Sequence, residues 1–321
     1  MSGAAGSEGR ANEAQKVSSL FARAAMARQA ATASPDLPQL SLNGYFTRVG
    51  LDKGDPRLRV PSVATLERIV AAHAAAIPFE NFDVLLGRGV SLNPEAIERK
   101  LIGARRGGYC FEQNGLLLAA LHAIGFEATP HAGRVRLQWP ATELPPRTHM
   151  FLRVMVDGDA WLADVGVGGL TPSRPLRMDE ANPQPTPHGD HRVLRRGDIL
   201  VHQAFVDDPH GGPEHGPSWI DVYESTGEPM APIDQEVANW WTSTSPRAKF
   251  SQNILVAMAR GDGVRVTLHN RRFVRRKGGR VVEQREWSDP EELLAILQVE
   301  FDLPFEPGTR FGGPNAPWYR G

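Results

Sequence analysis

The chain has 321 residues, of which 41% are hydrophobic, 23% charged and 7% aromatic, an ordinary composition for a folded globular protein. Its 36 Lys and Arg residues nearly balance 37 Asp and Glu residues, so the net charge is −1. A protein that binds nucleic-acid backbones normally carries a basic excess. The single cysteine excludes an internal disulfide and any zinc site that needs two thiolates. We therefore expect two or three folded domains and no nucleic-acid partner.

We find neither a membrane span nor a secretory signal in the sequence. No segment reaches the roughly 18 consecutive apolar residues of a membrane span. Residues 1–15 also lack the basic and apolar regions of a secretory signal. We expect a cytoplasmic protein without a membrane partner. Residues 1–40, rich in Ala, Ser and Gly, are expected to form a loosely held extension in which residues 18–30 could form a helix.

Helical periodicity characterises residues 41–125. One helix is predicted to open at Pro61, and a second covers Pro94–Leu101, with its proline at an N-terminal position. A third begins at about Cys110 and ends before Gly125, which stands where a C-cap belongs. This part of the chain is predicted to be a helical domain.

From Phe126 the hydrophobic period changes to two, which indicates strands. The predicted strands cover residues 134–138, 150–156, 160–165, 199–201, 264–268, 272–275 and 281–283, and a helix covers residues 290–297. Residues 171–220, rich in Pro, Gly and His, are typical of the loops of an antiparallel barrel or sandwich. The basic run 271–280 is predicted to be a charged hairpin; the alternative is an edge that contacts anions.

The most informative segment is RRGGYCFEQN, residues 105–114. Two glycines precede Cys110, and a helix is predicted to follow it. A thiol at a helix N-terminus meets unpaired N–H groups and the positive end of the helix dipole, and Arg105 and Arg106 lie nearby in sequence, so we expect the thiolate to be favoured. A lone cysteine is otherwise most often a small buried apolar residue. Catalysis therefore requires a base.

A predicted hairpin supplies the base. Asp157-Gly158 signals a type I′ turn, so that Val156 pairs with Asp159. In that register Asp164 lies diagonal to His149 on the same face of the sheet, close enough for the carboxylate to meet the imidazole. Covalent acyl transfer needs such a set: the thiolate attacks, the imidazole moves the proton and the carboxylate orients the imidazole.

The alternative for His149 is a strand histidine without a catalytic role. Other histidines lie in Pro/Gly-rich loops and are expected to be solvated: His188, His191, His210 and His215. The sequence contains no HExxH, Walker A or G-x-S-x-G motif, so we expect no metal.

These residues resemble the arylamine N-acetyltransferases in their bacterial form. The most specific match is RRGGYCFEQN, and further matches follow in the family's order at residues 45–51, 77–88, 133–135, 148–150, 163–166, 168–169 and 239–246. The resemblance covers roughly residues 42–305. It implies an α+β fold with an N-terminal helical bundle, a central antiparallel β-barrel and a C-terminal α/β lid around a cysteine-protease-like Cys-His-Asp core. We place these at residues 41–125, 126–230 and 231–321.

The resemblance also implies a ping-pong reaction. Acetyl-CoA, a co-substrate rather than a permanently bound cofactor, acetylates Cys110, and an arylamine or hydrazine then takes the acetyl group. The catalytic triad carries over as Cys110, His149 and Asp164. The implied CoA contacts are Thr148, Gly166, Gly168, Gly169, Trp241 and Arg247, and the implied acceptor contacts are Phe79, Val135 and Val167. Glu80 and Arg106 look like an ion pair that supports the cysteine loop.

Two positions depart from the family's pattern. Val167 stands where many relatives carry Phe, so the acceptor pocket is expected to be wider, and Ser245 stands where bacterial relatives often have His. The same triad would also serve a Cys-His-Asp hydrolase or a transglutaminase-type acyl transferase. A third reading is a catalytically idle binding protein on the same scaffold, although an intact triad weighs against it.

Overall fold

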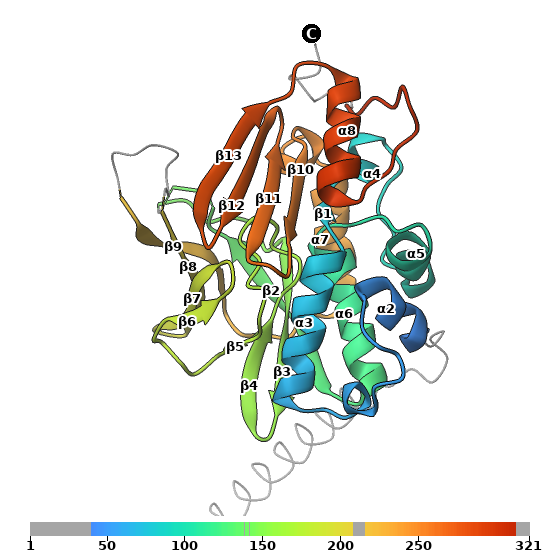
Figure 1. Ribbon diagram of the computed structural model, residues 1–321. Helices are drawn as coiled ribbons and strands as arrows, with labels where there is room; N and C mark the ends of the chain where they lie inside the picture. Colours follow the sequence, from blue (N-terminus) through green and yellow to red (C-terminus); the bar gives the residue numbers. More distant parts are fainter. Residues whose placement is uncertain (1–39, 138, 141, 208–215, 313–321) are drawn as a thin grey trace, which may run out of the picture. The chain divides into compact units, whose positions relative to one another are not determined.

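Helices form the N-terminal part of the described chain, which comprises residues 40–312 except 138, 141 and 208–215 of a computed structural model (Figure 1). They are α2 (Leu42–Val49), α3 (Val63–Ala76), α4 (Phe82–Leu85), α5 (Pro94–Glu98) and α6 (Cys110–Ile124), with a 3-10 turn at Pro56–Arg59 and a π-helical turn at Arg99–Gly103. The three predicted helices are confirmed. The expected extension and its residues 18–30 lie outside the described residues, apart from Leu40.

Local sequence explains where these helices begin and end. The Oγ of Ser62 accepts a hydrogen bond from the N–H of Thr65, which caps α3. Asn93 caps α5 in the same way, with Pro94 at the first position. Gly125 ends α6 at a φ of 102°, a left-handed conformation that favours glycine.

The apolar faces of α2, α3 and α6 share one core with a neighbouring β-strand. Its members include Phe46, Leu66, Ile69, Leu117, Leu121, Leu152 and Val154. Because the helices pack directly on a strand of the following sheet, the segment that begins with Cys110 is held against the segment that begins with His149.

An eight-stranded antiparallel sheet follows, in the order β5-β4-β3-β2-β9-β8-β7-β6. Its strands are β2 (Glu127–Val135), β3 (His149–Val156), β4 (Asp159–Ala163), β5 (Leu176–Arg177), β6 (Gln184–Thr186), β7 (Gly189–Arg196), β8 (Ile199–Val206) and β9 (Ser218–Ser225). The two ends of the sheet meet where the N–H of Arg177 donates to Oε1 of Gln184 at 2.7 Å. The sheet therefore closes into a near-barrel, as expected.

Two expectations for this sheet were wrong. The strand predicted over residues 134–138 begins at Glu127 and ends at Val135, because residues 127–133 pair with β3 before the last two residues turn to β9. Residues 171–220 were expected to be loops apart from the strand over 199–201, which is confirmed within β8, but they also contribute strands β5 to β7 and the start of β9. Pairing with neighbouring strands outweighs the local Pro and Gly content there.

The β3–β4 hairpin confirms the predicted register, since Val156 pairs with Asp159. Asp157 and Gly158 have φ values of 52° and 86°, and two positive values are what a type I′ turn requires. Asp164 follows directly after β4, at the end of the hairpin where β3 begins.

A five-stranded antiparallel sheet forms the C-terminal part, in the order β1-β10-β11-β12-β13. Its strands are β1 (Phe79–Glu80), β10 (Leu255–Ala259), β11 (Val264–His269), β12 (Arg272–Lys277) and β13 (Arg280–Glu286). Helix α8 (Pro290–Phe301) packs on one face, and the basic run forms the predicted hairpin of β12 and β13. Helix α7 (Pro232–Thr244) and the 3-10 turn η3 (Lys249–Ser251) connect the two sheets.

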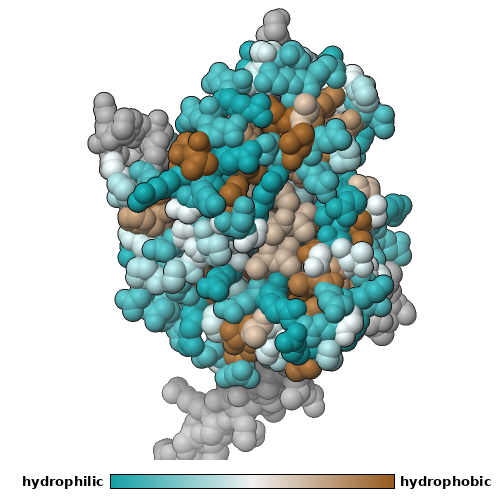
Figure 2. All heavy atoms as spheres, viewed as in Figure 1, coloured by the Kyte–Doolittle hydropathy of each residue, from teal (hydrophilic) through white to brown (hydrophobic). Residues whose placement is uncertain are grey.

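The described residues belong to one compact unit. Strand β1 lies between helices in the sequence yet pairs with β10, Phe79 opposite Ala257. We keep the division at residues 41–125, 126–230 and 231–321 as a proposal. None of the helices in the described ranges is long and apolar enough to cross a membrane. The face in Figure 2 is mostly hydrophilic, with apolar side chains in separate patches.

Candidate active site

Cys110 is the first residue of α6, and its side chain is 3% exposed. The two glycines before it are required by close packing. A Cβ on Gly107 would lie 2.1 Å from the carbonyl oxygen of Pro78, and one on Gly108 would lie 2.6 Å from Glu112 Oε2. Because both positions are glycine, the segment RGGYC packs closely against Pro78 and Glu112. Larger side chains at Gly107 and Gly108 would prevent this packing.

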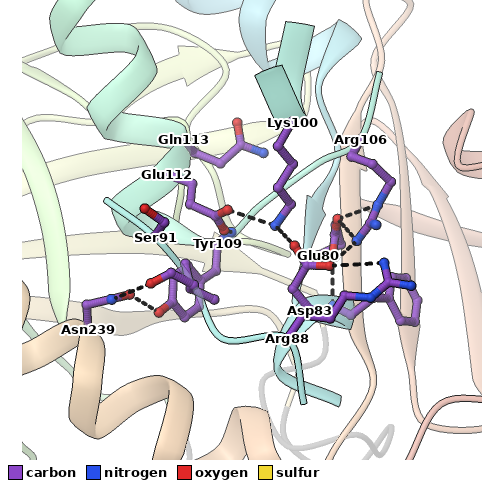
Figure 3. A network of polar contacts seen from close by, with 12 residues as sticks. Glu80, Asp83, Arg88, Ser91, Lys100, Arg106, Tyr109, Glu112, Gln113 and Asn239 are labelled. Carbon is purple, nitrogen blue, oxygen red and sulfur yellow. Dashed lines mark hydrogen bonds and ion pairs between the residues drawn. The ribbon is translucent and has the colours of Figure 1, made fainter. Parts of the chain in front are cut away.

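A buried network of ion pairs involves residues on either side of the segment 107–110 (Figure 3). Arg106 contacts Glu80 at 2.7 Å and Asp83 at 3.3 Å, and Lys100 contacts both Asp83 and Glu112 at 2.7 Å. Burial raises the pKa of the Glu112 carboxyl, and the charge of Lys100 limits the rise, so that this pKa lies at about 7. The expected ion pair between Glu80 and Arg106 is confirmed.

The arginines before the cysteine have partners of their own. Arg105 pairs with Asp302 at 2.8 Å, and Arg106 with Glu80. Both guanidinium charges are thus matched by carboxylates, and the expectation that they stabilise a thiolate gains no support from this geometry. The N-terminal end of α6 remains as a source of positive potential at the sulfur.

His149 and Asp164 form a buried pair. Nε2 of His149, the first residue of β3, lies 2.7 Å from Oδ2 of Asp164, and their side chains are 3% and 0% exposed. Oδ1 of Asp164 accepts hydrogen bonds from Nδ2 of Asn114 at 2.9 Å and from the N–H of Gly166 at 2.8 Å. All three contacts fix the carboxylate toward the imidazole.

The protonation of this pair follows from its surroundings. Burial lowers the pKa of His149. The charge and hydrogen bond of Asp164, and the contact between His149 and Cys110, raise this pKa to about 10. Burial raises the pKa of Asp164, yet His149, Asn114 and Gly166 lower it below its ordinary value. At neutral pH the geometry favours an imidazolium paired with a carboxylate.

The loop after β4 brings this pair to the cysteine. A Cβ on Gly166 would lie 2.7 Å from the Cα of Cys110 and 2.8 Å from Nδ2 of Asn114, so only glycine allows the loop to pack so closely. The thiol of Cys110 donates to the carbonyl oxygen of Thr148 at 3.6 Å. Since Asp164 engages Nε2 of His149, Nδ1 is the ring nitrogen left for proton exchange with the thiol.

A cavity of about 430 Å³ opens at Cys110 and His149. Asp164 is not among its lining residues and lies behind His149. The predicted contacts all line it: Phe79, Val135, Val167, Thr148, Gly166, Gly168, Gly169, Trp241 and Arg247. The described lining residues with ionisable side chains are Cys110, His149, Arg247, Lys249 and His269, so no described carboxylate faces the cavity.

Comparisons with known proteins identify the family. A family model described as N-acetyltransferase matches residues 62–309. An arylamine N-acetyltransferase / N-hydroxyarylamine O-acetyltransferase of Salmonella typhimurium is 40% identical over 262 residues, which are 82% of this chain and 88% of that protein. The chain belongs to the arylamine N-acetyltransferase family. The family, fold class and acyltransferase class expected from the sequence are therefore confirmed.

Solved structures of the family share this fold. The arylamine N-acetyltransferase from Salmonella typhimurium aligns with a TM-score of 0.75 at 39% identity, covering 87% of this chain and 96% of that chain. The Mycobacterium marinum arylamine N-acetyltransferase in complex with CoA aligns with a TM-score of 0.74 at 33% identity, covering 82% and 92%. Acetyl-CoA is the co-substrate of the family.

Several cavity residues were not foreseen. Lys249 and Phe250 of η3, Leu255 of β10 and His269 of β11 line the cavity but belong to no recognisable motif. A signal for the preceding helix was present: Pro232 followed by Asp234 is typical of a helix N-terminus.

Two histidines that were expected to be solvated, His188 and His191, are buried, so this expectation was wrong. His188 is 6% exposed, and its Nδ1 lies 2.6 Å from the hydroxyl of Ser173. His191 is 1% exposed and lies 3.0 Å from His202 across the β7–β8 pair. Strand pairing buries His191, whereas His188 lies in the turn between β6 and β7 and its Nε2 is 2.7 Å from the carbonyl oxygen of Arg260. His210 and His215 lie outside the described residues. The described residues contain no group of three or more His, Cys, Asp or Glu side chains that could hold a metal ion.

Proposed function

We propose that Cys110, His149 and Asp164 carry out the family's reaction in this chain, moving an acetyl group from acetyl-CoA to an arylamine or hydrazine. The observation that carries the proposal is the buried contact of 2.7 Å between His149 and Asp164, behind a cavity that His149 shares with the chain's only thiol. In this arrangement a single imidazole can serve both half-reactions.

Transfer of the Cys110 thiol proton to Nδ1 of His149 produces the imidazolium expected at neutral pH, and the first half-reaction starts from the resulting thiolate. The thiolate attacks the carbonyl carbon of acetyl-CoA, and the tetrahedral intermediate collapses with cleavage of the bond to the CoA sulfur. The imidazolium returns its proton to the departing CoA thiolate. Asp164 stays ionised throughout, because its role is to hold Nε2–H and stabilise the positive ring.

In the second half-reaction, the amine nitrogen attacks the thioester carbon. His149 takes the proton released by the new ammonium, and Cys110 leaves as a thiolate. The attacking nitrogen must be uncharged, which arylamines and hydrazines are near neutral pH. The cationic groups that line the cavity, Arg247 and Lys249, disfavour a protonated aliphatic amine.

The two substrates are assigned to different walls of the cavity. We assign CoA to Thr148, Gly166, Gly168, Gly169, Trp241 and Arg247. Gly168 has a φ of 82°, and a Cβ there would lie 3.4 Å from the ring of Phe79, so the loop turns tightly beside the cavity. Guanidinium and ammonium groups suit the phosphates of CoA. We assign the aromatic acceptor to Phe79, Val135 and Val167.

The same triad could serve a hydrolase. Transfer is favoured because Cys110 is 3% exposed and most lining side chains are apolar, which limits access of water to the thioester. The test is to supply acetyl-CoA with and without an arylamine, and to follow free CoA and N-acetyl product. Without amine, transfer predicts the release of one CoA per enzyme and no further turnover. With amine, CoA and N-acetyl product should rise together, and Cys110→Ala must abolish both. Steady CoA release without amine would identify a hydrolase.

We further propose that the partners are limited to small molecules and that the protein acts in the cytoplasm. Support comes from the balanced charge of −1 and from a single unpaired cysteine, which suits a reducing compartment.

A further inference from the structure

Tyr109, the residue before Cys110, forms hydrogen bonds through both its main chain and its side chain (Figure 3). Its main-chain N–H donates to Oε2 of Glu112 at 3.1 Å, which joins it to the ion-pair network behind the cysteine. Its phenol hydroxyl donates to Oδ1 of Asn239, 130 residues further along the chain. The ring between them is fully buried and lies edge-on to Phe250 at 5.5 Å. Tyr109 therefore links the cysteine loop to helix α7.

Asn239 uses both ends of its amide. While Oδ1 accepts from Tyr109, Nδ2 donates to the carbonyl oxygen of Val90 at 2.9 Å. Asn239 is 8% exposed. A side chain with both groups engaged at fixed partners defines the orientation as well as the distance of its helix.

Little else holds α7 in place. Of its 13 residues only Ala238, Asn239 and Thr242 are buried. On the outer face Ile233, Val237 and Trp240 are 63%, 61% and 66% exposed. Because the helix has so narrow a packed face, the directional contact at Asn239 has a large share in setting its position.

The end of α7 forms one wall of the cavity. Trp241 and Thr242 line it, as do Arg247, Ala248 and Lys249 shortly after the helix. We infer that the hydrogen bond between Tyr109 and Asn239 positions the CoA-side wall of the cavity relative to Cys110. Tyr109 and Asn239 are thus positioning residues for the acyl donor. The inference rests on the proposed assignment of Trp241 and Arg247 to CoA.

The substitution Tyr109→Phe tests this link, together with the hydrogen bond between the same hydroxyl and Ser243 of α7. It removes the hydroxyl but keeps the ring, and it leaves the main-chain contact with Glu112 untouched. We expect the KM for acetyl-CoA to rise roughly three- to tenfold, the effect of one lost neutral hydrogen bond. Acetyl transfer to the same arylamine from p-nitrophenyl acetate, a donor without the nucleotide, should stay within about twofold of the wild-type rate.

Two further variants separate positioning from general damage. Tyr45→Phe removes another fully buried phenol hydroxyl, which contacts Nδ1 of His73 at 3.0 Å. Tyr45 is not among the residues that line the cavity. It should lower stability comparably and leave the KM for acetyl-CoA unchanged. Asn239→Ala should reproduce the rise in KM. The double variant with Tyr109→Phe should have no higher KM than the more impaired single variant, because both substitutions remove the contact between Tyr109 and Asn239.

An unchanged KM for acetyl-CoA in Tyr109→Phe would overturn the inference. So would an equal loss with both donors, which would place the role of Tyr109 in the cysteine loop itself. If the wild-type protein produced no N-acetyl product from acetyl-CoA and an arylamine, the proposed function would fail first and the inference with it.

Discussion

Replacing Asp164 by Asn isolates the orienting role of the carboxylate. Two N–H donors, from Asn114 and Gly166, point at Oδ1 of Asp164, so the amide oxygen of Asn must take that place. Its NH₂ group then faces Nε2 of His149, which can only accept. The imidazole proton moves to Nδ1, the nitrogen that should take the proton of Cys110. The substitution therefore preserves shape but enforces the wrong tautomer.

The loss should be large. The carboxylate is the main favourable influence that raises the pKa of His149 to about 10, so without it burial dominates and the ring stays neutral. The same substitution in a Ser-His-Asp triad costs about 10⁴ in rate. We expect roughly 10³- to 10⁴-fold slower acetylation, or about 4–5.5 kcal/mol of barrier. The assay is rapid-quench measurement of CoA release in a single turnover with excess enzyme.

A matched control lies on the same hairpin. Asp159→Asn removes a carboxylate whose side chain is 43% exposed and which pairs with Arg177. This variant should keep the wild-type rate within about twofold. If Asp164→Asn, shown by circular dichroism to be folded, acetylated within tenfold of wild type, the tautomer argument would be refuted.

Three further variants test other parts of the account. Lys100→Met leaves the buried carboxylate of Glu112 without its cation and removes one of the cations beside Asp83. It should lower the free energy of unfolding in urea by roughly 3–5 kcal/mol; a loss below about 1 kcal/mol would contradict the role of the network. Burial lowers the pKa of His73 to about 4, so its neutral form stabilises the fold above pH 6.5 and this stability is lost as pH falls toward 4. His73→Leu should reduce the slope of unfolding free energy between pH 6 and 4 by up to about 1.4 kcal/mol per pH unit, and an unchanged slope would count against it. Val167→Phe should raise the KM for a fused-ring arylamine severalfold and hardly affect a small hydrazine; equal effects would show that Val167 does not face the acceptor.

The pairing of His149 with Asp164 was accessible from the sequence because its determinants are local. The Asp157-Gly158 turn and the alternation of β3 set the hairpin register, and that register places His149 near Asp164. The close packing of Gly107 and Gly108 was likewise reflected in the motif around Cys110. In the hairpin, neighbours in sequence determine the contact, whereas the glycines indicate a close approach without identifying Pro78 as the partner of Gly107.

Contacts between distant segments were not accessible in this way. Strand β1 has two residues, too few to show a period, and it exists because β10 pairs with it. His191 lies in a stretch whose composition suggests a loop, but pairing of β7 with β8 buries it. The hydrogen bond between Tyr109 and Asn239 depends on the position of α7 in the fold, which no local sequence pattern specifies.

The most direct test of the account is the fate of the acetyl group when acetyl-CoA is added without an amine. Mass spectrometry of the intact protein and of its peptides should find one acetyl group, attached to Cys110, and an added arylamine should remove it as N-acetyl product. An acetyl group on any other residue, or no adduct while N-acetyl product forms, would contradict a thioester on Cys110.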